Sequence, residues 1–316
     1  MASPSASEDA FDGVALSGGG IKAIVQLGVL HYYREKGLLD LDRITHYAGT
    51  SAGSIVGLLM ACGYEPMDIL QFVYQKDNLL GAAFQTTNLM SVFTNFGLMS
   101  FQPIIDIVEK MVVDKLGFSP TLAELKEKTG KFLAITAVNV HKMRLEYFTP
   151  ETNPRLKAIS AVNLSCNLPL LGQRMMYNNN YYVDGGLGDN FPHEAIEGRC
   201  QRILGVVVTG VVNNDSDEAS GGMGFASYLY KIVAFPINIM THLRCRYLGD
   251  HVTLVRFNYD NINILEFSLA RKKKMDMFMK GYQEGRREHS KEKLLVDGWS
   301  WESSDGEESG DGWTSW

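Results

Sequence analysis

Cysteine is scarce in this chain of 316 residues. The four cysteines, Cys62, Cys166, Cys200 and Cys245, lie far apart, without a Cys-x-x-Cys pair or the His and Cys spacing of a zinc site. Residues 1–12 have neither the basic start nor the apolar stretch of a secretory signal. We therefore expect free, buried thiols and a cytoplasmic protein.

Positive charge is missing from the C-terminal stretch 297–316, which contains six acidic residues and no lysine or arginine. In the rest of the chain, acidic and basic residues balance at 30 each, and no sustained basic face is present, which argues against nucleic acid as a partner. The acids also lack the D-x-D-x-D-G spacing of a calcium loop, so we expect no bound metal. They are Asp297, Glu302, Asp305, Glu307, Glu308 and Asp311.

These contrasts divide the chain into three parts. Residues 1–12 are polar, residues 13–293 have the composition of one large folded domain, and residues 294–316 form an acidic tail that holds all four tryptophans. The glycine, serine and acidic residues of the tail offer little to fold around, so we expect disorder there. The alternative is that the tryptophans dock on a protein partner.

Long apolar runs and internal repeats are also absent. The longest candidate, residues 225–243, is interrupted by Lys231, Pro236, Asn238 and His242, too often for a membrane span. It predicts a kinked helix that lies either in the core or on a bilayer surface. No unit of 20–50 residues recurs along the chain, which excludes repeat architectures.

The strands and helices expected between residues 13 and 293 predict an α/β fold. Residues 14–16 and 44–48 read as buried strands, and each is followed by a glycine turn and a helix, so that the opening requires parallel strands with right-handed crossovers. The whole pattern indicates a central, mostly parallel sheet of six or seven strands. Further strands are expected at 132–140, 144–148, 181–183, 203–209 and 252–257, and helices at 66–74, 103–113, 121–130, 156–164 and 269–293.

The second glycine turn carries the strongest chemical signal. Gly49-Thr50-Ser51-Ala52-Gly53 is a G-x-S-x-G motif between a strand and a helix, a setting that projects the serine hydroxyl from the end of a sheet. Backbone N–H groups of the helix start and of the first glycine turn can then converge on one oxygen. The motif predicts Ser51 as a nucleophile with an oxyanion hole made by Gly18, Gly19, Gly20 and Ala52.

A second candidate catalytic residue lies far downstream. Asp184 ends a short predicted strand and precedes Gly185 and Gly186, whose lack of side chains permits close approach to its carboxylate. Such a carboxylate can take the proton from Ser51 directly. A dyad of this kind needs neither a histidine nor a cofactor.

These motifs together resemble the patatin-like phospholipases over about residues 13–290. Ser17-Gly18-Gly19-Gly20-Ile21-Lys22 matches the glycine-rich oxyanion signature of that family, Gly49 to Gly53 its nucleophile elbow, and Asp184-Gly185-Gly186 its aspartate motif, with Asp189-Asn190-Phe191-Pro192 following. The resemblance implies a three-layer α/β/α fold and a Ser51/Asp184 dyad. It also implies metal-independent hydrolysis of acyl esters, with lipids as substrates, by a catalytic domain at 13–293.

Two further features bear on the substrate. Lys22 stands at the start of a helix, where a cation is electrostatically misplaced, so it either remains solvated or binds a lipid phosphate or an acid as a substrate-binding residue. The uncharged apolar loop 78–102 is either a packed insertion or, as we favour, a lid over an acyl-chain groove. We expect a phospholipid or another acyl lipid as substrate and peripheral contact with membranes.

Three other interpretations remain open. The order Ser51, Asp184, His251 also fits the triad of an α/β-hydrolase esterase. Gly18-x-Gly20-x-x-Ala23 fits a dinucleotide fingerprint, although the second strand ends in Gly49-Thr50-Ser51 instead of the acid that holds a ribose. The third is a catalytically silent lipid-binding module.

Overall fold

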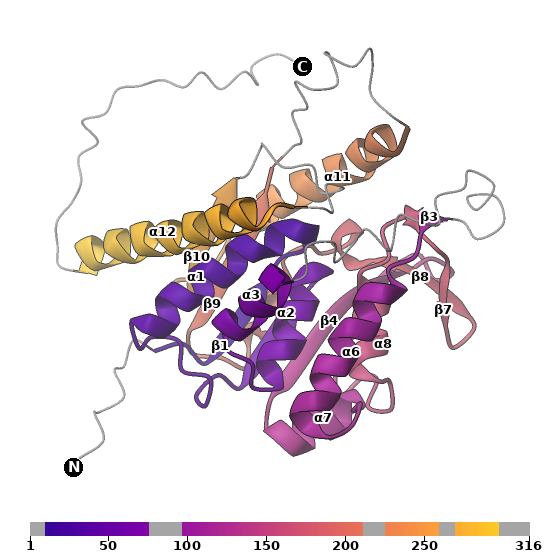
Figure 1. Ribbon diagram of the computed structural model, residues 1–316, viewed down its shortest axis with the longest axis horizontal. Helices are drawn as coiled ribbons and strands as arrows, with labels where there is room; N and C mark the ends of the chain where they lie inside the picture. The colour runs from indigo at the N-terminus through magenta and orange to yellow at the C-terminus, as the bar shows by residue number, and fades with distance from the viewer. Residues whose placement is uncertain (1–9, 76–96, 211–224, 259–268, 297–316) are drawn as a thin grey trace.

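The computed structural model of the protein describes residues 10–75, 97–210, 225–258 and 269–296. In this part of the chain the centre is an eight-stranded sheet in the order β10-β9-β1-β2-β4-β8-β7, with β5 also paired to β4. Figure 1 shows the larger helical layer on one face of this sheet, and a second apolar core lies under helices on the other face. The fold is therefore a three-layer α/β/α arrangement, as the sequence predicted.

Five of the eight strands of the sheet are parallel, and the other three pair in the antiparallel sense. The strands β10, β9, β1, β2 and β4 run parallel in that order, while β5 and β8 pair with β4 in the antiparallel sense and β7 pairs with β8 in the same way. A separate small sheet joins β3 to β6. The strands are β1 Gly13–Leu16, β2 His46–Gly49, β3 Gly97–Met99, β4 Phe132–Asn139, β5 Arg144–Phe148, β6 Leu170–Gly172, β7 Met175–Tyr177, β8 Asn180–Asp184, β9 Ile203–Thr209 and β10 Val252–Asn258.

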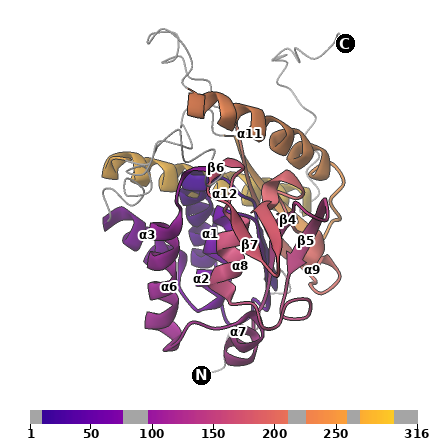
Figure 2. The ribbon, with the colours of Figure 1, turned by 90° about the vertical axis from the view of Figure 1, so that its right-hand side faces the viewer.

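Alternate residues of the central strands enter two separate apolar cores. Tyr47 and Leu204 belong to the larger core, whereas Ala48 and Ile203 face the smaller one. Because both faces of the parallel strands are buried, these strands are apolar throughout, as parallel strands between helical layers generally are. Figure 2 shows the sheet between the larger helical layer and α9.

The larger core lies under the helices α1, α2, α3, α6, α8 and α12, and the smaller one under α9 and the end of α11. Three residues separate the short 3-10 turn η1, which begins at Gly20, from the end of β1, and η2 follows β8 directly. The bounds are η1 Gly20–Lys22, α1 Ala23–Glu35, α2 Ala52–Ala61, α3 Pro66–Gln75, α6 Gln102–Leu116, α7 Leu122–Thr129, α8 Ala158–Ser165, η2 Gly185–Leu187, α9 Glu194–Glu197, α11 Phe225–Arg244 and α12 Arg271–Val296.

Several local signals act in the structure as the sequence indicated. Thr121 and Glu124 form a capping box, in which Glu124 N–H donates to Thr121 Oγ1 at 3.2 Å and Thr121 N–H donates to Glu124 Oε2 at 2.8 Å. Gly130 ends that helix with φ of 72°. The 225–243 run is helical, with Pro236 inside α11.

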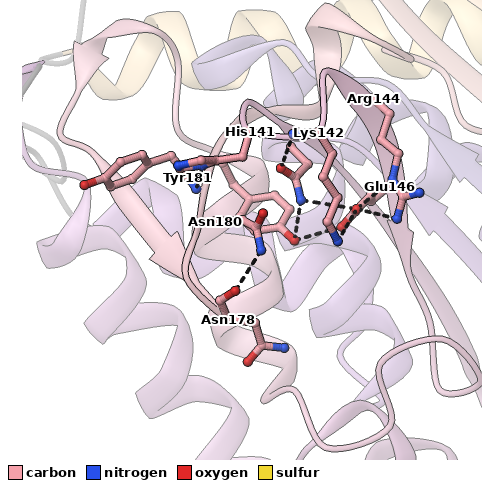
Figure 3. Close-up of polar contacts among 9 residues, drawn as sticks. His141, Lys142, Arg144, Glu146, Asn178, Asn180 and Tyr181 are labelled. Carbon is pink, nitrogen blue, oxygen red and sulfur yellow. Dashed lines mark hydrogen bonds and ion pairs between the residues drawn. The ribbon is translucent and has the colours of Figure 1, made fainter.

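The sequence-based prediction missed both strands of the small sheet, β3 and β6, and also β7 in the antiparallel edge. A polar network joins β5 to β8 there: Arg144 Nη2 lies 2.9 Å from Glu146 Oε1, and the Tyr182 hydroxyl donates to Glu146 Oε2 at 2.8 Å (Figure 3). The turn from β7 to β8 places Asn178 and Asn179 at φ of 47° and 59°. Positive φ at both central residues matches the right-handed twist of a hairpin, and asparagine tolerates it better than most residues do.

The first boundary also differs from the expected one. Phe11 is buried and its N–H donates to Leu38 O at 3.0 Å, and the Asp12 carboxylate accepts from the Gln201 and Arg202 N–H groups. The folded body thus includes residues 10–12, since one aromatic side chain anchors a segment that is otherwise polar. Residues 78–96, which are most of the proposed lid 78–102, and the tail from residue 297 lie outside the described residues.

Two glycines let α1 and α12 pack backbone to backbone. A Cβ added to Gly28 would lie 2.0 Å from Phe278 O, and one added to Gly281 would lie 2.0 Å from Val25 O. Neither distance leaves room for a methyl group, and backbone atoms cannot move aside as a flexible side chain does. This contact fixes α12 over the first helix.

We predict that Gly281→Ala lowers the free energy of unfolding by about 2 kcal/mol or more, because overpacking a close helix contact forces a backbone shift. Gly57→Ala in α2 is the matched control, since its Cβ would meet only Leu133 and Tyr47 at 3.6 and 3.9 Å. Alanine there should be neutral or stabilise by up to about 1 kcal/mol. Denaturant unfolding of both variants tests the contact, and equal stability would contradict it.

Candidate active site

Ser51 lies on the turn between β2 and α2. Its backbone has φ of 53° and ψ of −126°, a conformation that side-chain-bearing residues rarely adopt. A Cβ on Gly53 would lie 2.5 Å from the carbonyl oxygens of Leu16 and Ser17, and one on Gly49 would lie 2.6 Å from Gly53 O. Both glycines of the motif are therefore required by close backbone approach, and the serine between them is held in a strained turn.

Hydrogen bonds from three other elements hold this turn. Ser51 N–H donates to Ser165 Oγ at 2.8 Å, and the Ser54 hydroxyl donates to Ser51 O at 2.6 Å. The Thr50 hydroxyl oxygen lies 2.6 Å from Thr136 Oγ1 on β4, and it donates to Asp189 O at 2.8 Å. The serine turn is thus tied to the segment that follows Asp184.

The first glycine turn packs directly against the serine. A Cβ on Gly18 would lie 3.2 Å from Ser51 Cβ and 2.6 Å from Asn190 Oδ1. The Gly18 N–H donates to that same Asn190 Oδ1 at 3.1 Å. It is therefore engaged by Asn190 and does not stand free for an oxyanion, which differs from the expectation for this residue.

The other three predicted oxyanion donors are placed differently. No partner for the Gly19 N–H is found in the described part of the chain. Gly20 and Ala52 open η1 and α2, and the first N–H groups of a helix have no partner within it. Both helix starts line the pocket that Ser51 also lines.

Asp184 ends β8, opposite Ala137 of β4, and its side chain is buried. Its Oδ1 accepts from Gly186 N–H at 2.8 Å, whereas its Oδ2 has no hydrogen-bond partner of standard geometry among the described residues. Burial raises the pKa of this carboxyl to about 6, against the hydrogen-bonding influence of the nearby Ser51 hydroxyl and of Gly186 N–H, which lower it. A buried carboxylate therefore lies beside the serine.

Ser51 and Asp184 open onto a cavity of about 210 Å³. Lys22 is buried at its wall and its Nζ donates to Gly210 O at 3.4 Å. The side of the cavity formed by α2, α3 and α6 is apolar, a lining that favours a hydrocarbon chain over a polar ligand. Its residues there are Ile55, Val56, Leu59, Ile69, Phe72, Val73, Ile104, Ile105, Ile107, Val108 and Met111.

Two other residues of the site, Asn190 and Cys166, were not among the candidate site residues that the sequence indicated. Asn190 orients the glycine turn, and Cys166 lines the cavity with a buried thiol whose pKa is raised, by burial first and then by the Asp184 charge. Asn190 lies in the Asp-Asn-Phe-Pro stretch, which was a usable signal. The position of Cys166 depends on how α8 packs on β4 and β8, which the sequence does not reveal.

His251 is not near Ser51. It precedes β10, and its carbonyl accepts from Ile203 N–H at the amino end of β9, whereas Ser51 follows the carboxyl end of β2. The four residues of β2 alone separate these two edges by about 10 Å at the usual rise of a strand. His251 Nε2 instead lies 3.3 Å from Glu197 Oε1. The triad interpretation is therefore wrong, because parallel strands carry the two residues to opposite ends of the sheet.

The fold and the turn define a class of protein: an α/β/α domain with a serine at a strand-to-helix turn, a glycine turn against it and a buried aspartate beside it. The chain belongs to the patatin-like phospholipase family, because residues 14–196 match the sequence model of that family. Among the helices of the described residues, none has the length and apolarity needed to cross a bilayer.

The chain is similar to several proteins of known sequence or structure. A probable lipid hydrolase of Invertebrate iridescent virus 6 is 34% identical over 185 residues, which cover 57% of this chain and 61% of that protein, less than two thirds of its length. An uncharacterised protein of Acanthamoeba polyphaga mimivirus is 22% identical over 86% of this chain and 91% of its own. The crystal structure of VipD from Legionella pneumophila shares the fold, with a TM-score of 0.52 at 17% identity over 89% of this chain and 67% of VipD.

We predict that Ser165→Ala destabilises the protein by about 1–3 kcal/mol, because it leaves the Ser51 N–H buried without an acceptor. Ser54→Ala is the control: it removes a hydroxyl that donates to Ser51 O, but the Ser54 N–H still donates to that oxygen at 2.8 Å. Ser54→Ala should therefore lose less stability than Ser165→Ala. The measurement is the unfolding midpoint of each variant. Equal midpoints, or a lower midpoint for Ser54→Ala, would contradict this account of the turn.

Proposed function

We propose that the protein is a lipid acyl hydrolase of the phospholipase A or lysophospholipase type. The observation that carries the proposal is the pairing of Ser51, held in a strained turn, with the buried carboxylate of Asp184 at one end of an apolar cavity. The probable lipid hydrolase among the relatives supports a lipid as substrate.

In the proposed reaction, Ser51 Oγ attacks the carbonyl carbon of an acyl ester and its proton passes to Asp184. The N–H groups of Gly19, Gly20 and Ala52 stabilise the negative oxygen of the tetrahedral intermediate. The intermediate collapses, the leaving alkoxide takes the proton back from Asp184, and the acyl group remains on Ser51. Water, activated by Asp184, then attacks the acyl-enzyme, releases the fatty acid and restores the serine. No step requires a metal.

The lining of the cavity supports distinct roles for its residues. The apolar side formed by α2, α3 and α6 accommodates the acyl chain, because burial of hydrocarbon is favourable roughly in proportion to the area removed from water. Lys22 also lines the cavity, and its Nζ, which donates to Gly210 O, is the candidate contact for a lipid phosphate. The ester carbonyl then lies at Ser51.

We predict that Ser51→Ala and Asp184→Asn each lower the rate of hydrolysis of a fluorogenic acyl ester by at least roughly 10³-fold, because members of one catalytic unit fail together. His251→Ala, at the far edge of the sheet, should change the rate little. Wild-type protein that binds lipid but releases no product would instead identify a silent lipid-binding module. A large loss at His251 would contradict the dyad.

We further predict that kcat/KM for an uncharged ester rises with pH through about 6 and then levels off, because the pKa of Asp184 is raised to about 6 and only the carboxylate accepts a proton. Below that pH the carboxyl is protonated and the base is lost. A pH profile between 4 and 8 measures this limb. A limb near the ordinary carboxyl pKa of about 4 would exclude the buried aspartate as the group that titrates.

A further inference from the structure

The helix α11 carries an apolar stripe on its solvent side. Phe235 is 60% exposed although it is large and aromatic, and its apolar neighbours three or four positions away are exposed as well. Residues at these spacings lie on one face of a helix. The stripe consists of Tyr228, Ile232, Phe235, Ile239 and Leu243, with Met240 beside it.

The opposite face of the same helix forms part of the cavity wall. Tyr230, Ala234, Ile237 and Asn238 of α11 line the cavity that contains Ser51 and Asp184. The helix also contacts β6 and η2, the turn that follows Asp184 directly. One helix thus separates the candidate active site from the apolar stripe, and Figure 2 shows it along one rim of the molecule.

The charged side chains of α11 itself have one sign, although Arg244 at its end lies 3.2 Å from Glu194 Oε2. Between Phe225 and Arg244 there is no acidic residue. Just beyond the end of the helix, Arg246 is exposed, and Arg246 and Arg256 bring guanidinium nitrogens to 3.1 and 3.4 Å from the ring nitrogens of His242. Tyr247, next to them, is 87% exposed. Apolar side chains flanked by cations and an aromatic hydroxyl are the composition of a helix that lies in a bilayer interface.

We propose that the outer face of α11 is the surface by which this protein docks on a lipid bilayer, with the stripe among the acyl chains and Arg246 and Tyr247 at anionic head groups. The inference deepens the proposed function and rests on it for the role of the cavity. Because the inner face of the helix lines that cavity, docking through this surface places the candidate active site next to its lipid substrate. A protein partner or a second copy on the stripe would cover α11 without supplying lipid.

The test is sedimentation with vesicles of phosphatidylcholine, with and without phosphatidylserine. All variants are made in the Ser51→Ala background, so that hydrolysis does not alter the vesicles. Phe235→Asp combined with Ile239→Asp should lower the vesicle affinity at least about tenfold, because two apolar contacts are lost and two carboxylates are added to the interface. Arg246→Glu should weaken binding to the anionic vesicles and leave binding to pure phosphatidylcholine nearly unchanged.

Met176→Asp is the matched control, because Met176 on β7 is also 60% exposed but lies outside the stripe. It should bind vesicles as the unsubstituted background does. Each variant should keep the thermal midpoint of the background, which verifies folding. Unchanged vesicle affinity after the double substitution at 235 and 239 would overturn the proposal. Loss of a dimer by the same double substitution, with no vesicle binding by the background protein, would assign the stripe to self-association instead.

The outcome is separable from that of the proposed function. In protein with an intact serine, the two aspartate substitutions should leave turnover of a short, soluble ester unchanged and lower turnover of vesicle phospholipid. Vesicle binding that depends on the stripe, in a protein that hydrolyses neither substrate, would keep the docking surface and reject the hydrolase. Equal hydrolysis of vesicle phospholipid by the protein with and without the two aspartate substitutions would keep the hydrolase and reject the docking surface.

Discussion

The structure depends on a close backbone approach between the first glycine turn and the start of α2. Gly53 lies where any Cβ would collide with the carbonyls of Leu16 and Ser17, and Gly18 lies against Ser51. These contacts bring two parallel strands, each with its own turn, into register at one edge of the sheet. The Ser51 conformation and the N–H groups around it follow from that approach, since glycine alone permits such spacing.

Much of this arrangement could be predicted because its signals are local. The apolar strands β1, β4 and β9 and the capped helix α7 lie close to where periodicity and capping residues indicated. The serine turn could be located because G-x-S-x-G between a strand and a helix implies one backbone geometry. The position of Ser51 at the carboxyl edge of a parallel sheet then follows from chain direction alone.

The rest depends on contacts between residues far apart in the chain. The sequence does not reveal that β8 pairs antiparallel with β4, which is what brings Asp184 to Ser51, nor that Asn190 engages the Gly18 N–H. His251 illustrates the converse. Its order in the chain fits a triad, but β10 is parallel to the central strands, and His251 precedes its amino end, whereas Ser51 follows the carboxyl end of β2. No β7 to β8 hairpin was predicted from the sequence, although its turn residues Asn178 and Asn179, the first two of three consecutive asparagines, favour the positive φ of such a turn.

The packing of α12 on α1 has a consequence for how the chain folds. β1 lies between β2 and β9, which are separated by more than 150 residues, and α1 is covered by the last described helix. The larger core therefore stays open during synthesis until residues near Gly281 have left the ribosome. Non-local closure of this kind slows folding and leaves apolar surface exposed to aggregation. A nascent chain of this protein would thus depend on chaperones longer than one built from sequentially adjacent strands.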